Sequence, residues 1–118
     1  MKLNELQELV CQFRDERNWK QFHNAKDMAL SLSLEAAELL ELTQWKSEQE
    51  IKNYFESNPE VLGDELADVL YWVLLIGKDF NIDLAKALQT KIKKNEVKYP
   101  VELALNSKKK YGELEKTS

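Results

Sequence analysis

The sequence predicts an all-α protein, and two observations support this prediction. Only 3 glycines and 2 prolines interrupt the 118 residues, and the apolar residues between them recur at helical spacing rather than alternating as in strands. With 43% hydrophobic residues, a chain of this length can bury a core, which excludes a mainly disordered protein. We therefore expect one folded domain over residues 1–118, with its core at about 2–100 and a polar tail at 101–118.

The first two helices are expected at about residues 2–17 and 25–46, separated by a polar loop at 18–24. Within the first, an apolar stripe at helical spacing is expected to form the buried face. The stripe consists of Leu3, Leu6, Leu9, Val10 and Phe13. A short polar helix or loop is expected at 47–58.

The third helix is expected from Pro59 to about Phe80, because proline fits the first helical turn and Asn58 can cap it by accepting free backbone N–H groups. Its run over residues 69–76 is apolar on all sides, which indicates burial on both sides and hence an oligomer. This run is too short to cross a bilayer. A fourth helix is expected at about 82–98, ending before Pro100 because the residue preceding proline avoids the helical conformation.

Charge and cysteine content exclude several classes of function. The formal net charge is −4 and the pI is near 5.1, which argues against binding a nucleic acid polymer or a membrane surface. Cys11 cannot form an internal disulfide, and with a single histidine, His23, the chain cannot build a zinc finger or a zinc hydrolase site. The N-terminal residues do not follow the pattern of a signal peptide. These features predict a cytoplasmic protein.

Two acid pairs occur in otherwise apolar helices. Glu35 and Glu38 in the second helix lie about 60° apart on the helical wheel, with apolar residues between and beside them. Glu65 and Asp68 repeat this spacing in the third helix. If the two helices pack together, four carboxylates converge on one spot.

Such convergence needs compensation, since two carboxylates about 5.5 Å apart repel by about 3 kcal/mol at an effective dielectric constant near 20. Protonation is one solution. Hard divalent cations such as Mg²⁺ or Mn²⁺, which prefer oxygen ligands, are another. Ordinary surface ion pairs are the alternative to any such site. A helical di-iron centre is excluded, because it needs Glu-x-x-His motifs and Lys20 stands three residues before His23.

The acid pairs, with Glu41 following the first, resemble the signature of the MazG-like all-α nucleotide pyrophosphohydrolases. Three further segments resemble the dCTP pyrophosphatase branch of that family. These are residues 17–23 (RNWKQFH), 39–46 (LLELTQWK) and 98–101 (KYPV). Together the matches span most of residues 3–101.

The resemblance implies a MazG-like bundle of four to five helices, assembled as a homodimer or homotetramer in which helices of two subunits form the core. It implies hydrolysis of a nucleoside triphosphate to the monophosphate and diphosphate, with dCTP or modified nucleotides as substrates. Mg²⁺, or Mn²⁺ in its place, would be held by the four acids of the two pairs, Glu35, Glu38, Glu65 and Asp68.

The remaining candidate residues are assigned to water activation and substrate binding. Either Glu38 or Glu41 could orient or deprotonate the attacking water, and a structural role for Glu41 is equally open. Lys91 and Asn95 share one face of the fourth helix and could contact the polyphosphate, although lysine stripes are commonly solvated. The aromatic candidates for the nucleoside pocket are Trp19, His23, Trp45 and Trp72, for which ordinary packing is the alternative.

Two further functions stay open at this point. The substrate could be dUTP or a broad range of noncanonical triphosphates, because base choice depends on the shape of a pocket. Alternatively, the chain could be a helical oligomer that binds nucleotides or a protein without catalysis.

Overall fold

The computed structural model describes residues 1–106, which are helical with no strand. The elements are α1 (Leu3–Glu16), the 3₁₀ helix η1 (Trp19–Phe22), α2 (Ala25–Glu41), α3 (Glu48–Ser57), α4 (Pro59–Asp79), α5 (Leu84–Lys98) and α6 (Val101–Ala104). The chain divides into two compact units, Met1–Ile82 and the part from Asp83 onward. The predicted all-α fold class is confirmed.

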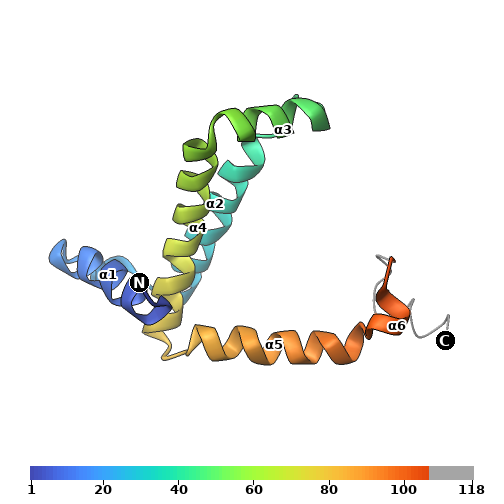
Figure 1. The fold of residues 1–118 in the computed structure, drawn as a ribbon. Coiled ribbons are helices and arrows are strands. Elements are labelled where there is room, and N and C mark those ends of the chain that lie inside the picture. Colours follow the sequence, from blue (N-terminus) through green and yellow to red (C-terminus); the bar gives the residue numbers. More distant parts are fainter. Residues whose placement is uncertain (107–118) are drawn as a thin grey trace. The chain divides into compact units, whose positions relative to one another are not determined.

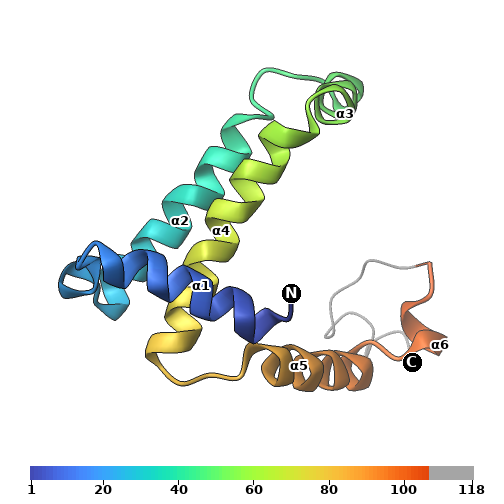
Figure 2. The same cartoon turned by 60° about the vertical axis from the view of Figure 1, so that its left-hand side comes forward.

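In the first unit, α2 and α4 run antiparallel and side by side, and α3 connects them at one end (Figures 1 and 2). Helix α1 crosses the other end of this pair and packs against α4. The most deeply buried apolar side chains of the described residues are Cys11, Met28, Leu74 and Leu75. They lie on α1, α2 and α4, so these three helices share the core.

Capping explains where α2 and α3 begin. The side chain of Asn24 accepts a hydrogen bond from the backbone N–H of Asp27 at 2.9 Å. At α3, Ser47 and Glu50 form a reciprocal capping box. Residues 48–57 therefore form a helix rather than a loop, which were the two possibilities expected for this segment.

Helix α2 ends at Glu41, earlier than the expected end near Lys46. A turn replaces its last part, and there the hydroxyl of Thr43 donates to the carbonyl of Leu40 at 2.7 Å. Trp45 then adopts a left-handed backbone conformation with φ of 61°, which a helix does not accommodate. The expected loop at 18–24 likewise contains the short helix η1.

The cap predicted for the third helix is wrong in its chemistry. Asn58 precedes α4, but its side chain makes no hydrogen bond to the first turn. Its amide instead donates backward to the carbonyl of Tyr54 at 2.9 Å. Asn58 therefore satisfies the end of α3, while Pro59 occupies the first turn of α4 as predicted.

The buried face of α1 also differs from the predicted apolar stripe. Leu9 and Phe13 are 52% and 43% exposed, whereas Arg14 is 1% exposed. Polar contacts hold this face on α4, because Gln7 donates to the carbonyl of Leu74 at 3.0 Å and Arg14 pairs with Asp79 at 2.8 Å. Three residues of the stripe, Leu9, Val10 and Phe13, line a cavity instead.

The second unit begins with Asp83, whose side chain accepts from the N–H of Lys86 at 3.0 Å and caps α5. Helix α5 therefore starts at Leu84, close to the expected position. The expected polar tail begins with the short helix α6 rather than irregular chain, and its remainder at 107–118 lies outside the described residues. Among residues 1–106, no helix has both the length and the apolar character needed to span a bilayer.

Candidate active site

Two helices bring four carboxylates together. Helix α2 contributes Glu35 and Glu38, and α4 contributes Glu65 and Asp68. The i, i+3 spacing places each pair on one side of its helix. One carboxylate oxygen from each of the four residues lies within 4.8 Å of the others. The packing of α2 on α4 thus concentrates negative charge where the sequence pattern predicts it.

Within residues 1–106, the negative charge of the cluster is not compensated. One oxygen each of Glu35 and Glu65, Oε2, is buried and has no hydrogen-bond partner among these residues. Loss of hydration raises the pKa of Glu35, and the hydrogen bond and negative charge of Glu38 raise it further. Loss of hydration and the charges of Glu38 and Asp68 likewise raise the pKa of Glu65. A missing positive charge is the simplest account of this arrangement.

A divalent cation fits this donor set. The four groups offer only oxygen ligands, which hard cations prefer over softer metals. The orphaned Oε2 atoms of Glu35 and Glu65 supply buried lone pairs that no group of the described protein uses. The site can therefore hold a metal ion through its own side chains.

Without divalent cations, folded stability is expected to fall as the pH rises from the ordinary glutamate pKa through the raised values of Glu35 and Glu65. These carboxyls hold protons more tightly in the folded than in the unfolded chain. Their contribution is therefore complete at low pH and lost across this range. Thermal melts in chelator at a series of pH values measure the effect. The double variant Glu35→Gln/Glu65→Gln should show a flatter profile, and identical profiles would contradict the prediction.

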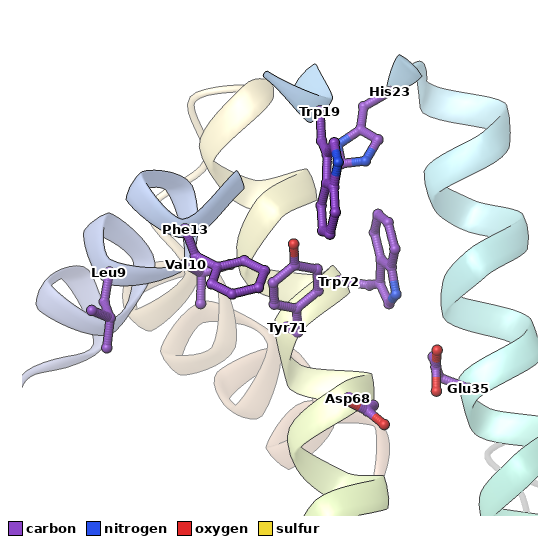
Figure 3. A pocket seen from close by; sticks show the side chains of 9 residues that line it. All are labelled: Leu9, Val10, Phe13, Trp19, His23, Glu35, Asp68, Tyr71 and Trp72. Carbon is purple, nitrogen blue, oxygen red and sulfur yellow. The ribbon is translucent and has the colours of Figure 1, made fainter. Parts of the chain in front are cut away.

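A cavity of about 490 Å³ adjoins the acid cluster, a volume typical of small-molecule sites. It is lined by Leu9, Val10, Phe13, Trp19, His23, Glu35, Asp68, Tyr71 and Trp72. Figure 3 shows Glu35 and Asp68 at one end, with Trp19 and His23 at the other and Trp72 between them. One cavity thus joins an acidic end to an aromatic end.

Edge-to-face contacts organise the aromatic end. The ring of Trp72 lies 5.2 Å from His23 and 5.2 Å from Tyr71, both centroid to centroid. Phe13 contacts Tyr71 at 6.3 Å and Trp19 at 5.8 Å. Such pairs favour one another electrostatically beyond the area that they bury. Rings from α1, η1 and α4 therefore form the walls of this part of the cavity.

The other predicted site residues lie elsewhere. Glu41 ends α2 and is exposed, outside the group of four acids. Trp45 is 97% exposed and does not line the cavity. Lys91 and Asn95 belong to α5 in the second unit, where Lys91 lines a hollow together with Lys86 and Lys94.

Several pocket residues were assigned to the core by their sequence pattern. Leu9, Val10 and Phe13 formed the predicted buried stripe, and Tyr71 lies in the apolar run of α4. Leu9 and Phe13 are not buried as the stripe predicted, but line the cavity while partly exposed. The two sequence patterns do not distinguish a packed core from the wall of a cavity, because both need apolar side chains at helical spacing.

Residues 30–114 match the MazG-like family. The chain belongs to this family. The MazG-like match covers both acid pairs, most of α2 and all of α4. The all-α fold is therefore that of a MazG-like protein.

Curated MazG-like relatives are similar along nearly the whole chain. Human and rat (Homo sapiens and Rattus norvegicus) dCTP pyrophosphatase 1 are each 35% identical to it over 114 residues, which is 95% of this chain and 67% of theirs. A crystal structure of a pyrophosphatase from Archaeoglobus fulgidus superimposes with a TM-score of 0.77 at 39% identity, covering 82% of this chain and 91% of that one. The predicted resemblance to the dCTP pyrophosphatase branch is confirmed.

Proposed function

We propose that this protein is a Mg²⁺-dependent nucleoside triphosphate pyrophosphohydrolase. It hydrolyses a (d)NTP to the (d)NMP and diphosphate, with dCTP or a modified nucleotide as substrate. In this role it removes nucleotides from the cellular pool. The cytoplasmic location stays a prediction.

One observation carries the proposal: the acid cluster and the aromatic cavity share Glu35 and Asp68. A nucleoside triphosphate has an aromatic base at one end and a polyanion at the other. The aromatic end of the cavity suits the base, whereas the acidic end suits a polyphosphate only with cations between the two sets of charges. Relatives named as pyrophosphatases support the same reading.

The four acids would hold Mg²⁺, with Mn²⁺ as a substitute that prefers the same oxygen ligands. When bound, the ion supplies positive charge against the polyphosphate and lowers the pKa of an attacking water. The buried Oε2 atoms of Glu35 and Glu65 then gain partners. Helices α2 and α4 fix the four carboxylates on rigid backbone, which limits reorganisation during the reaction.

The reaction transfers the α-phosphoryl group to water. The water oxygen bonds to the α-phosphorus in line with the leaving group, and the bond from that phosphorus to the bridging oxygen breaks. A carboxylate accepts the proton of the water, and diphosphate leaves with the bridging oxygen. Glu38 is the leading proton acceptor, since it belongs to the cluster whereas Glu41 lies outside it.

The nucleoside would lie between the rings of the aromatic end, with Trp72 as the main stacking surface and Trp19 and His23 beside it. Base faces stack on aromatic rings largely without regard to sequence. Lys91 and Asn95 of α5 are proposed to contact the polyphosphate. Ammonium and amide N–H groups are suitable donors to phosphate oxygens.

Product analysis tests the proposal directly. Purified protein is incubated with each NTP and dNTP in ¹⁸O-labelled water, with and without Mg²⁺. We expect monophosphate and diphosphate, with the label only in the monophosphate because water attacks the α-phosphorus. The rates name the preferred base and separate dCTP from dUTP or a broad substrate range.

Two other outcomes would overturn the proposal. Nucleoside diphosphate with orthophosphate would indicate attack at the γ-phosphorus and a different hydrolase. No turnover of any triphosphate, with retained nucleotide binding, would identify a non-catalytic binding protein.

Replacing Trp72 by Ala is expected to raise KM for the preferred triphosphate by about 5- to 150-fold, because stacking of one base contributes about 1–3 kcal/mol. The value of kcat should change much less, since Trp72 lies between the acids and the far end of the cavity rather than in the cluster. Steady-state kinetics measure both quantities. The control is Trp72→Phe, which keeps an aromatic face and should stay within a few-fold of the wild type. An unchanged KM for Trp72→Ala would contradict this assignment.

We also propose that the protein works as a homodimer or homotetramer. Leucines on α2 and α4 stay exposed in the single chain, including Leu34 at 57% and Leu66 at 49%. Apolar side chains gathered on neighbouring helices are typical of an interface. Trp45, at 97% exposed, is then free to contribute to the nucleoside pocket of a partner subunit.

Mixed oligomers test this arrangement. Subunits carrying Trp45→Ala are mixed with subunits carrying Glu38→Gln under conditions that allow exchange. If Trp45 serves the partner's site, the mixture regains activity, because one site per pair then has its acids and its tryptophan intact. No recovery would place Trp45 in the site of its own chain, and a monomeric mass by light scattering would overturn the oligomer.

A further inference from the structure

A buried ion pair lies directly behind the pocket histidine. Arg14 of α1 donates from Nη1 and Nη2 to the two carboxylate oxygens of Asp79 in α4, at 2.8 and 2.9 Å. The side chain of Arg14 is 2% exposed and that of Asp79 is 13% exposed. Two parallel charge-assisted hydrogen bonds fix the plane of the guanidinium. The pair therefore holds one positive charge at a defined position.

His23 meets this guanidinium with one ring nitrogen. Nδ1 of His23 lies 3.5 Å from Nη1 of Arg14. A guanidinium can only donate, so Nδ1 must offer its lone pair. A proton on Nδ1 would direct one N–H group at another, and in the imidazolium it would also place two positive charges side by side. The arrangement therefore favours the neutral form protonated at Nε2 over both the imidazolium and the neutral form protonated at Nδ1.

We propose that Arg14, held by Asp79, is a positioning residue that fixes His23 as a neutral imidazole whose one N–H group, at Nε2, is available to the nucleoside. The proposal deepens the proposed function and rests on it for the identity of the ligand. Under it, the far end of the cavity offers an uncharged donor to an acceptor atom of the base or sugar.

Further contacts support the geometry. The backbone N–H of His23 donates to the carbonyl of Lys20 at 3.0 Å, and its ring packs edge-to-face on Trp72. Burial lowers the pKa of His23, the charge of Arg14 lowers it further, and Asp79 acts in the opposite direction. The charge of Lys20 acts on Asp79. Residues of α1, η1 and α4 therefore determine the protonation state of the His23 ring.

Nitrogen-15 NMR of the untagged protein tests the proposal without any turnover. Because the chain has 1 histidine, every imidazole signal belongs to His23. Long-range ¹H–¹⁵N spectra of the metal-free protein near neutral pH should show Nε2 protonated and Nδ1 unprotonated. If the His23 ring of the wild-type protein is protonated at Nδ1, or at both nitrogens, this result by itself overturns the proposal.

Two variants are expected to shift the titration of His23 in opposite directions. Arg14→Gln removes the positive charge and should raise the proton affinity of His23 about tenfold, whereas Asp79→Asn should lower it about tenfold, the scale of one nearby charge. If the substitutions merely loosened the pocket, the pKa of His23 would move toward the ordinary histidine value in both variants. Shifts in the same direction, or no shift in either variant, would therefore overturn the proposal. If either variant fails to fold, the other decides by the direction of its shift.

Arg17→Gln is the control. It removes a neighbouring arginine of the same region and should leave the titration of His23 unchanged.

Kinetics then connect this state to the nucleoside. Arg14→Gln should raise KM about five- to tenfold, as expected for loss of one neutral hydrogen bond, with little change in kcat. Arg14→Lys keeps the positive charge and should restore much of the affinity. An NMR result as predicted combined with no triphosphate turnover would leave the histidine state established and would overturn only the proposed function.

Discussion

Replacing Glu38 by Gln is expected to lower kcat by at least about 10³-fold and, in the same protein without metal, to raise the melting temperature. The activity falls because a carboxylate that holds the cation and accepts the proton is lost, a contribution of several kcal/mol. The melting temperature rises because the charge of Glu38 opposes ionisation of Glu35 and Glu65 in the folded protein. Steady-state kinetics and thermal melts in chelator measure the two effects.

The opposite signs make this variant informative. Glu60→Gln, at an exposed acid on α4, is the control and should change neither quantity strongly. Retained activity in Glu38→Gln would remove Glu38 from the chemistry. An equal loss of kcat in Glu41→Gln, with an unchanged metal-free melting temperature, would assign the proton transfer to Glu41.

Replacing Arg14 by Met is expected to lower the free energy of unfolding by about 3 kcal/mol, because the buried carboxylate of Asp79 then loses its partner. Adding Asp79→Leu should recover most of this loss, since an apolar pair of similar volume no longer leaves a buried charge. Denaturant unfolding of the two single variants and the double variant measures the coupling. Arg17→Met, at an exposed arginine that stacks on Phe13, serves as control and should change stability by only about 1 kcal/mol or less. Additive effects would contradict a coupled pair.

The ion pair between Arg14 and Asp79 also contributes to the change in folded stability at acidic pH. Hydrogen bonds from Arg14 hold the pKa of Asp79 below its ordinary value. Its contribution to stability is therefore complete above the ordinary aspartate pKa and is lost as the pH falls through the lowered value. In Arg14→Met this contribution is already absent, so the difference in stability between wild type and variant should shrink in acid.

Local patterns were sufficient to predict the four long helices and the two acid pairs. A helical period is a property of neighbouring residues, so the apolar spacing and the i, i+3 acids could be interpreted without knowledge of the fold. The hydrogen bonding of Asn58 could not be predicted in this way, because its amide donates to the preceding helix rather than capping the following one. Two helices compete for this one side chain, and the sequence alone does not rank them.

Long-range pairing accounts for the other differences. Arg14 and Asp79 are 65 positions apart, and each looks like an ordinary surface charge in its own helix. Arg14 lies on the buried face of α1, whereas Phe13 of the predicted core lines the cavity. No period in the sequence contains this information, since the outcome depends on one ion pair between distant segments.

The placement of the three tryptophans makes the protein its own optical reporter. Trp19 and Trp72 line the cavity, whereas Trp45 is almost fully exposed. In a Trp45→Phe background, all remaining indole emission comes from the walls of the cavity. Stacking of a base on these rings should quench that emission, so ligand occupancy can be followed in real time without a label. With a non-hydrolysable triphosphate analogue and Mg²⁺, binding can then be timed separately from bond cleavage.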